Sequence, residues 1–127
     1  MPEFQFSYSG ILYNEDGSTA NPGLKPALQI KIPGITEYNG GEVIKLPTAS
    51  TNVNVPISQV DEAKYLIIET NENISLKLNA SDATAIPIAC YGTPKKGVFV
   101  CTLTGITNLY LTNSSGNTAE VKYLFGS

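Results

Sequence analysis

The sequence contains no histidine, no arginine and no tryptophan, and each absence counts against a class of function. Without histidine, the chain lacks the usual general base, the commonest metal ligand and the partner of a catalytic serine or cysteine. Without arginine, it lacks the planar donor best suited to phosphate groups, and a net charge of −3 offers no positive face to a nucleic acid. We therefore predict a protein that is not an enzyme, with no cofactor, no metal and no nucleic-acid partner.

Charged residues are also scarce, at 15% of the chain. Serine, threonine and asparagine fill the polar positions, which favours strands and turns over long surface helices. No apolar run approaches the roughly 20 residues that a membrane helix needs, and the first ten residues, MPEFQFSYSG, show no signal-peptide pattern. We expect synthesis in the cytoplasm and no membrane partner. We interpret the glycosylation sequons at Asn73, Asn79 and Asn113 as chance matches.

Alternation of apolar and polar residues with a period of two runs through the whole chain. This pattern is typical of half-buried strands, and proline, glycine and asparagine clusters separate the runs. We predict an all-β fold, an antiparallel β-sandwich or jelly roll of about eight or nine strands, in one domain over residues 1–127. The main runs are FQFSYSGILY (4–13, with a bend at Gly10), ALQIKI (27–32), EVIKL (42–46), KYLIIET (64–70), NISLKLN (73–79), AIPIACY (85–91), GVFVCTL (97–103), NLYLTN (108–113) and TAEVKYLF (118–125).

Turn residues between the runs predict which strands pair. Three hairpins are expected, around residues 71–73, 93–96 and 114–117, and Asn39-Gly40-Gly41 predicts a fourth. Two further stretches are expected to be loops. They cover residues 14–23 and 47–56, the second with a short edge strand at Val53–Val55, and residues 60–64 form the one helical turn.

The two cysteines, Cys90 and Cys101, fall on strands expected to be neighbours. In a register that places Cys90 opposite Cys101 a disulfide is sterically conceivable, and one step of register forbids it. We interpret both as reduced, small buried hydrophobic residues. The carboxylates Asp61, Glu62 and Glu69 and their neighbour Glu72 are interpreted as solvated side chains, in preference to a hydrolytic acid pair.

Aromatic side chains are the best candidates for contacts with a partner. Tyrosine combines an apolar ring with a polar tip and is enriched at interfaces, although most of the seven tyrosines would equally suit the core. The aromatic stripe at the start of the chain consists of Phe4, Phe6 and Tyr8. A strand that carries it is suited to pairing with a neighbouring subunit by edge addition, or to forming the first strand of the same core. The candidate contact residues are Phe4, Phe6, Tyr8, Tyr13 and Tyr38.

The last third of the chain, GVFVCTLTGITNLYLTNSSGNTAEVKYLFG, resembles the ending of many small β-rich bacteriophage virion proteins. In those proteins a strand, an I-T-x-L-x-L-x-N segment, an Asn/Ser/Gly turn and a final apolar strand complete a sandwich. The matching residues are Ile106, Thr107, Leu109, Leu111 and Asn113, followed by residues 114–117 and 121–125.

This resemblance implies a structural subunit of a tailed-phage virion, such as a capsid cement or decoration protein, or a small neck or tail component. Its partners would be the major capsid protein or neck and tail proteins, contacted through residues 14–23 and 47–56, and its own copies, with a homotrimer as one arrangement. Two alternatives belong to other classes. A carbohydrate- or receptor-binding module would use tyrosines and asparagine-rich loops, although tryptophan is missing. A small jelly-roll enzyme of the cupin type would need histidine ligands that the chain lacks.

Overall fold

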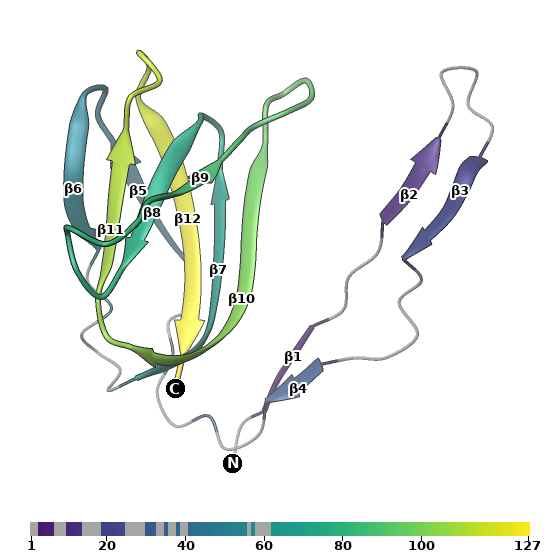
Figure 1. Cartoon of the computed structure of the whole chain (residues 1–127), viewed down its shortest axis with the longest axis horizontal. Helices are drawn as coiled ribbons and strands as arrows, with labels where there is room; N and C mark the ends of the chain where they lie inside the picture. Colours follow the sequence, from purple (N-terminus) through teal and green to yellow (C-terminus); the bar gives the residue numbers. More distant parts are fainter. Residues whose placement is uncertain are drawn as a thin grey trace. The chain divides into compact units, whose positions relative to one another are not determined.

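The computed structural model describes residues 3–6, 10–13, 19–24, 30–32, 35, 38, 41–55, 57 and 62–127. Within these residues there are twelve β-strands and no helix, and every strand pairing is antiparallel (Figure 1). The prediction of an all-β antiparallel fold is therefore confirmed. The chain divides into two compact units, Met1–Ile35 and Thr36–Ser127.

The first unit is a two-stranded ribbon. Strand β1 (Phe4–Phe6) pairs with β4 (Ile30–Ile32), and further along the same two segments β2 (Gly10–Tyr13) pairs with β3 (Thr19–Leu24). Residues 19–23, which the sequence predicts to be loop, are thus part of a strand. A strand in a two-stranded ribbon tolerates Pro22 because one of its edges needs no donor, and register shifts in the β2–β3 ladder accommodate the irregular sequence.

The described residues of the second unit form eight strands in two four-stranded sheets. They are β5 (Glu42–Leu46), β6 (Ser50–Val55), β7 (Ala63–Thr70), β8 (Ile74–Leu78), β9 (Ile86–Ile88), β10 (Gly97–Ile106), β11 (Leu109–Asn113) and β12 (Ala119–Gly126). One sheet has the order β10-β7-β12-β5 and the other the order β6-β11-β8-β9.

This strand order is that of a jelly roll. Counting inward from the two ends of the unit, the first strand pairs with the last, β5 with β12, and then β6 with β11, β7 with β10 and β8 with β9. The further pairings β12–β7 and β11–β8 join these strand pairs into two sheets. Four antiparallel strand pairs folded over in this way form the double Greek key of the eight-stranded jelly roll.

Two of the predicted hairpins are wrong for this reason. β7 and β8 flank the turn at residues 71–73 but belong to opposite sheets, and so do β11 and β12, which flank residues 114–117. The hairpin around residues 93–96 is confirmed at its tip, where Tyr91 and Lys96 exchange backbone hydrogen bonds of 3.1 and 2.9 Å. Beyond the tip, β9 pairs with β8. Alternation within a strand is the same whether the next strand lies beside it or across the sandwich.

Elsewhere in this unit the predicted edge strand at Val53–Val55 is confirmed as part of β6, which is an edge strand of its sheet. Ala63 and Lys64, predicted to end a helical turn, instead begin β7, and residues 58–61 lie outside the described part of the chain. Of the predicted turn at 39–41, Gly41 has a φ of 90°, while residues 39 and 40 lie outside the described residues.

The core lies between the two sheets and draws on alternate residues of both. Leu66, Ile68, Val121 and Phe125 from one sheet pack in one cluster with residues of the other, and all four are fully buried. The contributions from the facing sheet are Val55, Ile74, Leu76, Ile88, Leu109 and Leu111. Burial of large aliphatic and aromatic side chains at about 1.5 to 3 kcal/mol each is the main stabilising term of this unit.

Candidate interaction surfaces

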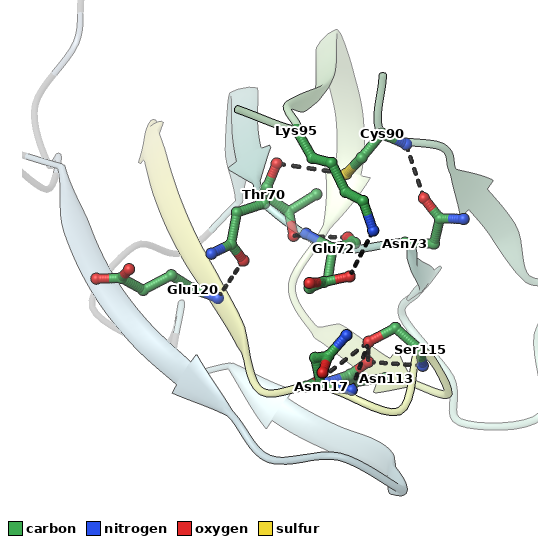
Figure 2. Close-up of polar contacts among 10 residues, drawn as sticks. Thr70, Glu72, Asn73, Cys90, Lys95, Asn113, Ser115, Asn117 and Glu120 are labelled. Atoms are coloured by element: carbon green, nitrogen blue, oxygen red, sulfur yellow. Dashed lines mark hydrogen bonds and ion pairs between the residues drawn. The ribbon is translucent and has the colours of Figure 1, made fainter. Parts of the chain in front are cut away.

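The turns at one end of the jelly roll are held by asparagine side chains. Asn113 ends β11 and is completely buried. Its Nδ2 donates to the backbone carbonyl of Leu46 at 2.9 Å. Its Nδ2 also donates to the backbone carbonyl of Asn117 at 2.7 Å, and its Oδ1 accepts from the backbone N–H of Ser115 at 3.0 Å (Figure 2). A buried amide that satisfies both strand-end carbonyls and a turn N–H fixes the loop at residues 114–117 against β5.

Two more asparagines connect neighbouring turns at this end. The Oδ1 of Asn71 accepts from the backbone N–H of Glu120 at 2.8 Å, which links the turn after β7 to β12. The Oδ1 of Asn73 accepts from the backbone N–H of Cys90 at 2.8 Å, which links the same turn to the chain after β9 (Figure 2). These loops therefore present a fixed polar surface.

This role of asparagine was not among the predictions from the sequence. At the opposite end of β8, Asn79 has a φ of 70°, donates to the carbonyl of Gly105 at 2.7 Å and accepts from the N–H of Thr107 at 2.9 Å. All three sequon asparagines, Asn73, Asn79 and Asn113, thus use their side-chain amides for backbone contacts. The signal was available, since asparagine directly after a strand favours side-chain-to-backbone turns and left-handed φ.

A shallow polar groove lies beside these turns, with a volume of about 300 Å³. Charged residues of both signs line it, and two of its lysines are ion-paired: Lys96 Nζ lies 2.9 Å from Glu69 Oε1, and Lys95 Nζ lies 3.7 Å from Glu72 Oε2. Both partners of the Lys96–Glu69 pair are exposed, and exposed pairs of this kind contribute about 0 to 1 kcal/mol. The groove offers donors and acceptors to a polar ligand or to a partner's side chains. Its lining residues are Val43, Glu69, Thr70, Asn71, Lys95, Lys96, Glu120 and Lys122.

The candidate contact residues from the sequence fall in both units. Phe4 and Phe6 belong to β1 and Tyr13 to β2, so three of them lie on the ribbon, whereas Tyr8 lies outside the described residues. Tyr38, in the second unit, is 60% exposed and pairs with Gly126 of β12. The structure does not gather these residues into one described site, and their contact role stays a prediction.

Tyr91 is an exposed aromatic residue that was not among the predicted contact residues. It is 78% exposed at the tip of the loop between β9 and β10. Tyr65 and Tyr123, by contrast, are buried, in line with the expectation that many tyrosines belong to the core.

Both cysteines are free thiols, and they are not opposite one another. Cys101 pairs with Leu66 across the β10–β7 ladder, while Cys90 directly precedes the Tyr91–Lys96 bridge and its Sγ lies 3.4 Å from the carbonyl oxygen of Thr70. Burial, and then the nearby Glu72 carboxylate, raise the pKa of the Cys90 thiol, while Lys95 opposes them in part. A raised pKa leaves this thiol protonated at neutral pH and therefore a weak nucleophile.

The predicted solvated carboxylates are engaged in ordinary contacts. Glu69 and Glu72 form the ion pairs described above, Glu62 accepts from the backbone N–H of Gly105, and Asp61 lies outside the described residues. In the described part of the chain, no three histidine, cysteine or acidic side chains cluster as a metal site would require.

Within the described residues no helix is long and apolar enough to cross a membrane. Comparisons with protein-family models, with curated proteins and with solved structures found no match.

Proposed function

We propose that this chain is a non-enzymatic structural subunit of a bacteriophage virion, and in particular a capsid cement or decoration protein that stabilises a shell by protein–protein contacts. The resemblance of residues 97–126 to the endings of small virion proteins supports the proposal. So does the fold class by analogy, because jelly rolls are common in viral capsid proteins.

The observation that carries the proposal is the two-stranded ribbon of residues 1–35. Each of its described strands pairs with one other described strand, and residues 1–35 form a compact unit of their own. A two-stranded ribbon is at best marginally stable in water and needs a further strand or an apolar surface against it. The sequence of this ribbon includes Phe4 in β1 and Tyr13 in β2, and aromatic residues are enriched at protein–protein interfaces.

A cement protein acts by adding binding free energy to the assembled state. In this proposal the jelly roll supplies a folded body, and the ribbon supplies the residues that contact a neighbouring shell subunit. The partner in this proposal is the major capsid protein, with neck or tail proteins as the other particle components that such a ribbon would fit, and the protein is located in the virion.

The test is whether the chain is part of a particle. Phage particles released from cells that carry the coding gene would be banded by density and analysed by quantitative mass spectrometry. We expect the chain at a constant ratio to the main shell protein across fractions. A chain that stays in the lysate and is absent from the banded particles contradicts the proposal.

Variants then locate the contact. A chain that begins at Ile35 is expected to fold but to fail to bind particles that lack the protein. Tyr91→Ala, which removes an exposed aromatic ring outside the ribbon, is the matched control and is expected to bind normally.

The polar groove favours one second candidate, a carbohydrate- or receptor-binding module. Its amide, hydroxyl and charged groups, among them Asn71, Thr70 and Glu120, are of the kind that bind sugar hydroxyl groups. A glycan array probed with the purified chain separates the two functions. Retention on a defined glycan that Asn71→Ala abolishes favours the binding module.

A further inference from the structure

We infer that the open edge of strand β10 is a self-association surface, where the strand pairs antiparallel with β10 of a second copy of this chain. This inference goes beyond the proposed function and does not depend on it. It rests on the composition of β10, on the contrast with the other sheet edges, and on the exposure of its side chains.

The first observation is that β10 lies at a sheet edge but has the composition of an interior strand. Among the described strands it forms a ladder only with β7. Its sequence from Gly97 to Ile106, GVFVCTLTGI, contains no charged residue and no proline. Strands with consecutive apolar residues are typical of positions covered on both faces, and β10 has such a run, GVFVC, at the edge of its sheet.

The other three edges of the two sheets are protected against pairing in the usual ways. β5 carries Glu42 and Lys45, and β9 is three residues long with Pro87 at its centre. β6 has a register shift in its ladder with β11, near Asn52, whose φ is 50°. β10 has an irregularity only between Thr102 and Ile106, which leaves residues 97–102 in regular register with β7.

Apolar side chains are exposed on both faces of β10. On the outer face Val98 is 54% exposed and Val100 is 47% exposed. On the inner face Phe99 and Leu103 pack against the core but are only partly buried, and so is Cys101. A strand added at this edge would cover both rows, which a ligand on one face would not.

A second copy of β10 is the occupant that these features fit. The added strand must itself be uncharged, apolar on both faces and open at one edge, and β10 has all three properties. Copies of a chain with a net charge of −3 repel one another, so an uncharged edge is where they can meet at the lowest electrostatic cost. Because each β10 has one open edge, the pairing closes as a twofold dimer.

The register follows from the two faces of the sheet. Opposed residues must come from the same face, because a one-residue slip would place the outer row of one copy beside the covered inner row of the other. The backbone groups of Lys96 already form hydrogen bonds with Tyr91, so the pairing between the two copies of β10 begins after Lys96. The register that uses only residues 98–102 places Val100 opposite Val100 of the second copy, and Val98 opposite its Thr102.

The test measures the mass of the full chain by light scattering and sedimentation over a range of concentrations. We expect a dimer in the wild type. Val100→Lys is expected to weaken the dimer by at least about 100-fold, because it places two like charges opposite one another without disturbing the core. Val43→Lys is the matched control: Val43 is 51% exposed on β5, at the other edge of the same sheet, and its substitution should leave the dimer intact.

A mixing experiment separates this pairing from a folding defect. Val100→Lys and Val100→Glu are each expected to be folded monomers by circular dichroism, and an equimolar mixture should form a heterodimer because the opposite charges then face one another. Failure of the mixture to associate overturns the pairing. So does a wild type that is monomeric at every concentration, a trimer, or a dimer that Val100→Lys leaves unchanged.

Discussion

At the scale of single residues, asparagine side chains hold the turns of the jelly roll in place through hydrogen bonds to the backbone. The side-chain amides of Asn71, Asn73, Asn79 and Asn113 all form hydrogen bonds with backbone groups from distant parts of the chain. A primary amide offers two donors and one acceptor oxygen, so one side chain can satisfy several strand-end groups that would otherwise be buried without partners.

Asn113 makes the clearest case for a stability effect. Asn113→Ala leaves the carbonyls of Leu46 and Asn117 and the N–H of Ser115 without this partner, and we expect a loss of about 2 to 4 kcal/mol in the free energy of unfolding. Urea denaturation measures it. Asn117→Ala, in the same turn, keeps the backbone carbonyl and should cost less than about 0.5 kcal/mol. Equal losses for the two variants would contradict this role of Asn113.

The raised pKa of Tyr123 predicts how the free energy of unfolding depends on pH. Burial, and then the hydrogen bond of 2.7 Å to Glu42 together with the charge of that carboxylate, raise the pKa of Tyr123 to about 12 from its usual 10.0. The protonated phenol is the form that the folded state favours. The free energy of unfolding that this pKa shift contributes is therefore fully present below pH 10. It is lost as the pH rises from about 10 to 12, and the loss is about 2 to 3 kcal/mol.

The measurement is the free energy of unfolding as a function of alkaline pH. Tyr123→Phe removes the titrating group, so the wild type should lose more stability than the variant across this interval. Burial also raises the pKa of Tyr65, and that contribution is common to both proteins and cancels in the difference. Parallel curves for the two proteins would show that Tyr123 does not carry the effect.

At the scale of elements, the junction between β9 and β10 depends on Gly97. A Cβ at this position would lie 2.7 Å from the carbonyl oxygen of Ala89 and 2.9 Å from both Cys90 Sγ and Ile88 Cγ2. The residues after β9 therefore approach β10 at a point where only glycine fits, which is how the chain passes from one sheet to the other.

Gly97→Ala is expected to destabilise the jelly roll by about 1 to 3 kcal/mol, because the backbone of residue 89 must move to relieve the overlap. Thermal melting checks this. Thr102→Ala, an exposed position on the same strand, serves as control and should change the free energy of unfolding by less than about 0.5 kcal/mol. An unchanged melting temperature in Gly97→Ala would mean that the two segments separate without cost.

At the scale of the whole molecule, the chain combines a jelly roll with a ribbon, and the prediction of one domain over residues 1–127 is open to experiment. A chain that begins at Ile35 contains all eight strands of the jelly roll. We expect it to melt cooperatively within about 5 °C of the full chain, since the core cluster lies within residues 46–125. Loss of cooperative melting would mean instead that the two units fold as one domain.

The sequence by itself determined the fold class and the composition of the core. Alternation with a period of two depends only on local residue order, so it correctly predicts antiparallel strands. In the structure, apolar residues of the predicted run at 73–79, such as Ile74 and Leu76, are buried in the core. The shortage of charged residues and the asparagine-rich turns are likewise properties of the residue order alone.

Only the tertiary structure decided which strands pair and what the turns do. β7 and β8 follow one another closely but lie in opposite sheets, while β5 pairs with β12 from the far end of the chain. Alternation specifies that a strand has a buried face, but not which strand lies at its edge. Pairing depends instead on how all the strands bury their apolar faces together, and among the described strands that same arrangement leaves the uncharged β10 at the edge of its sheet.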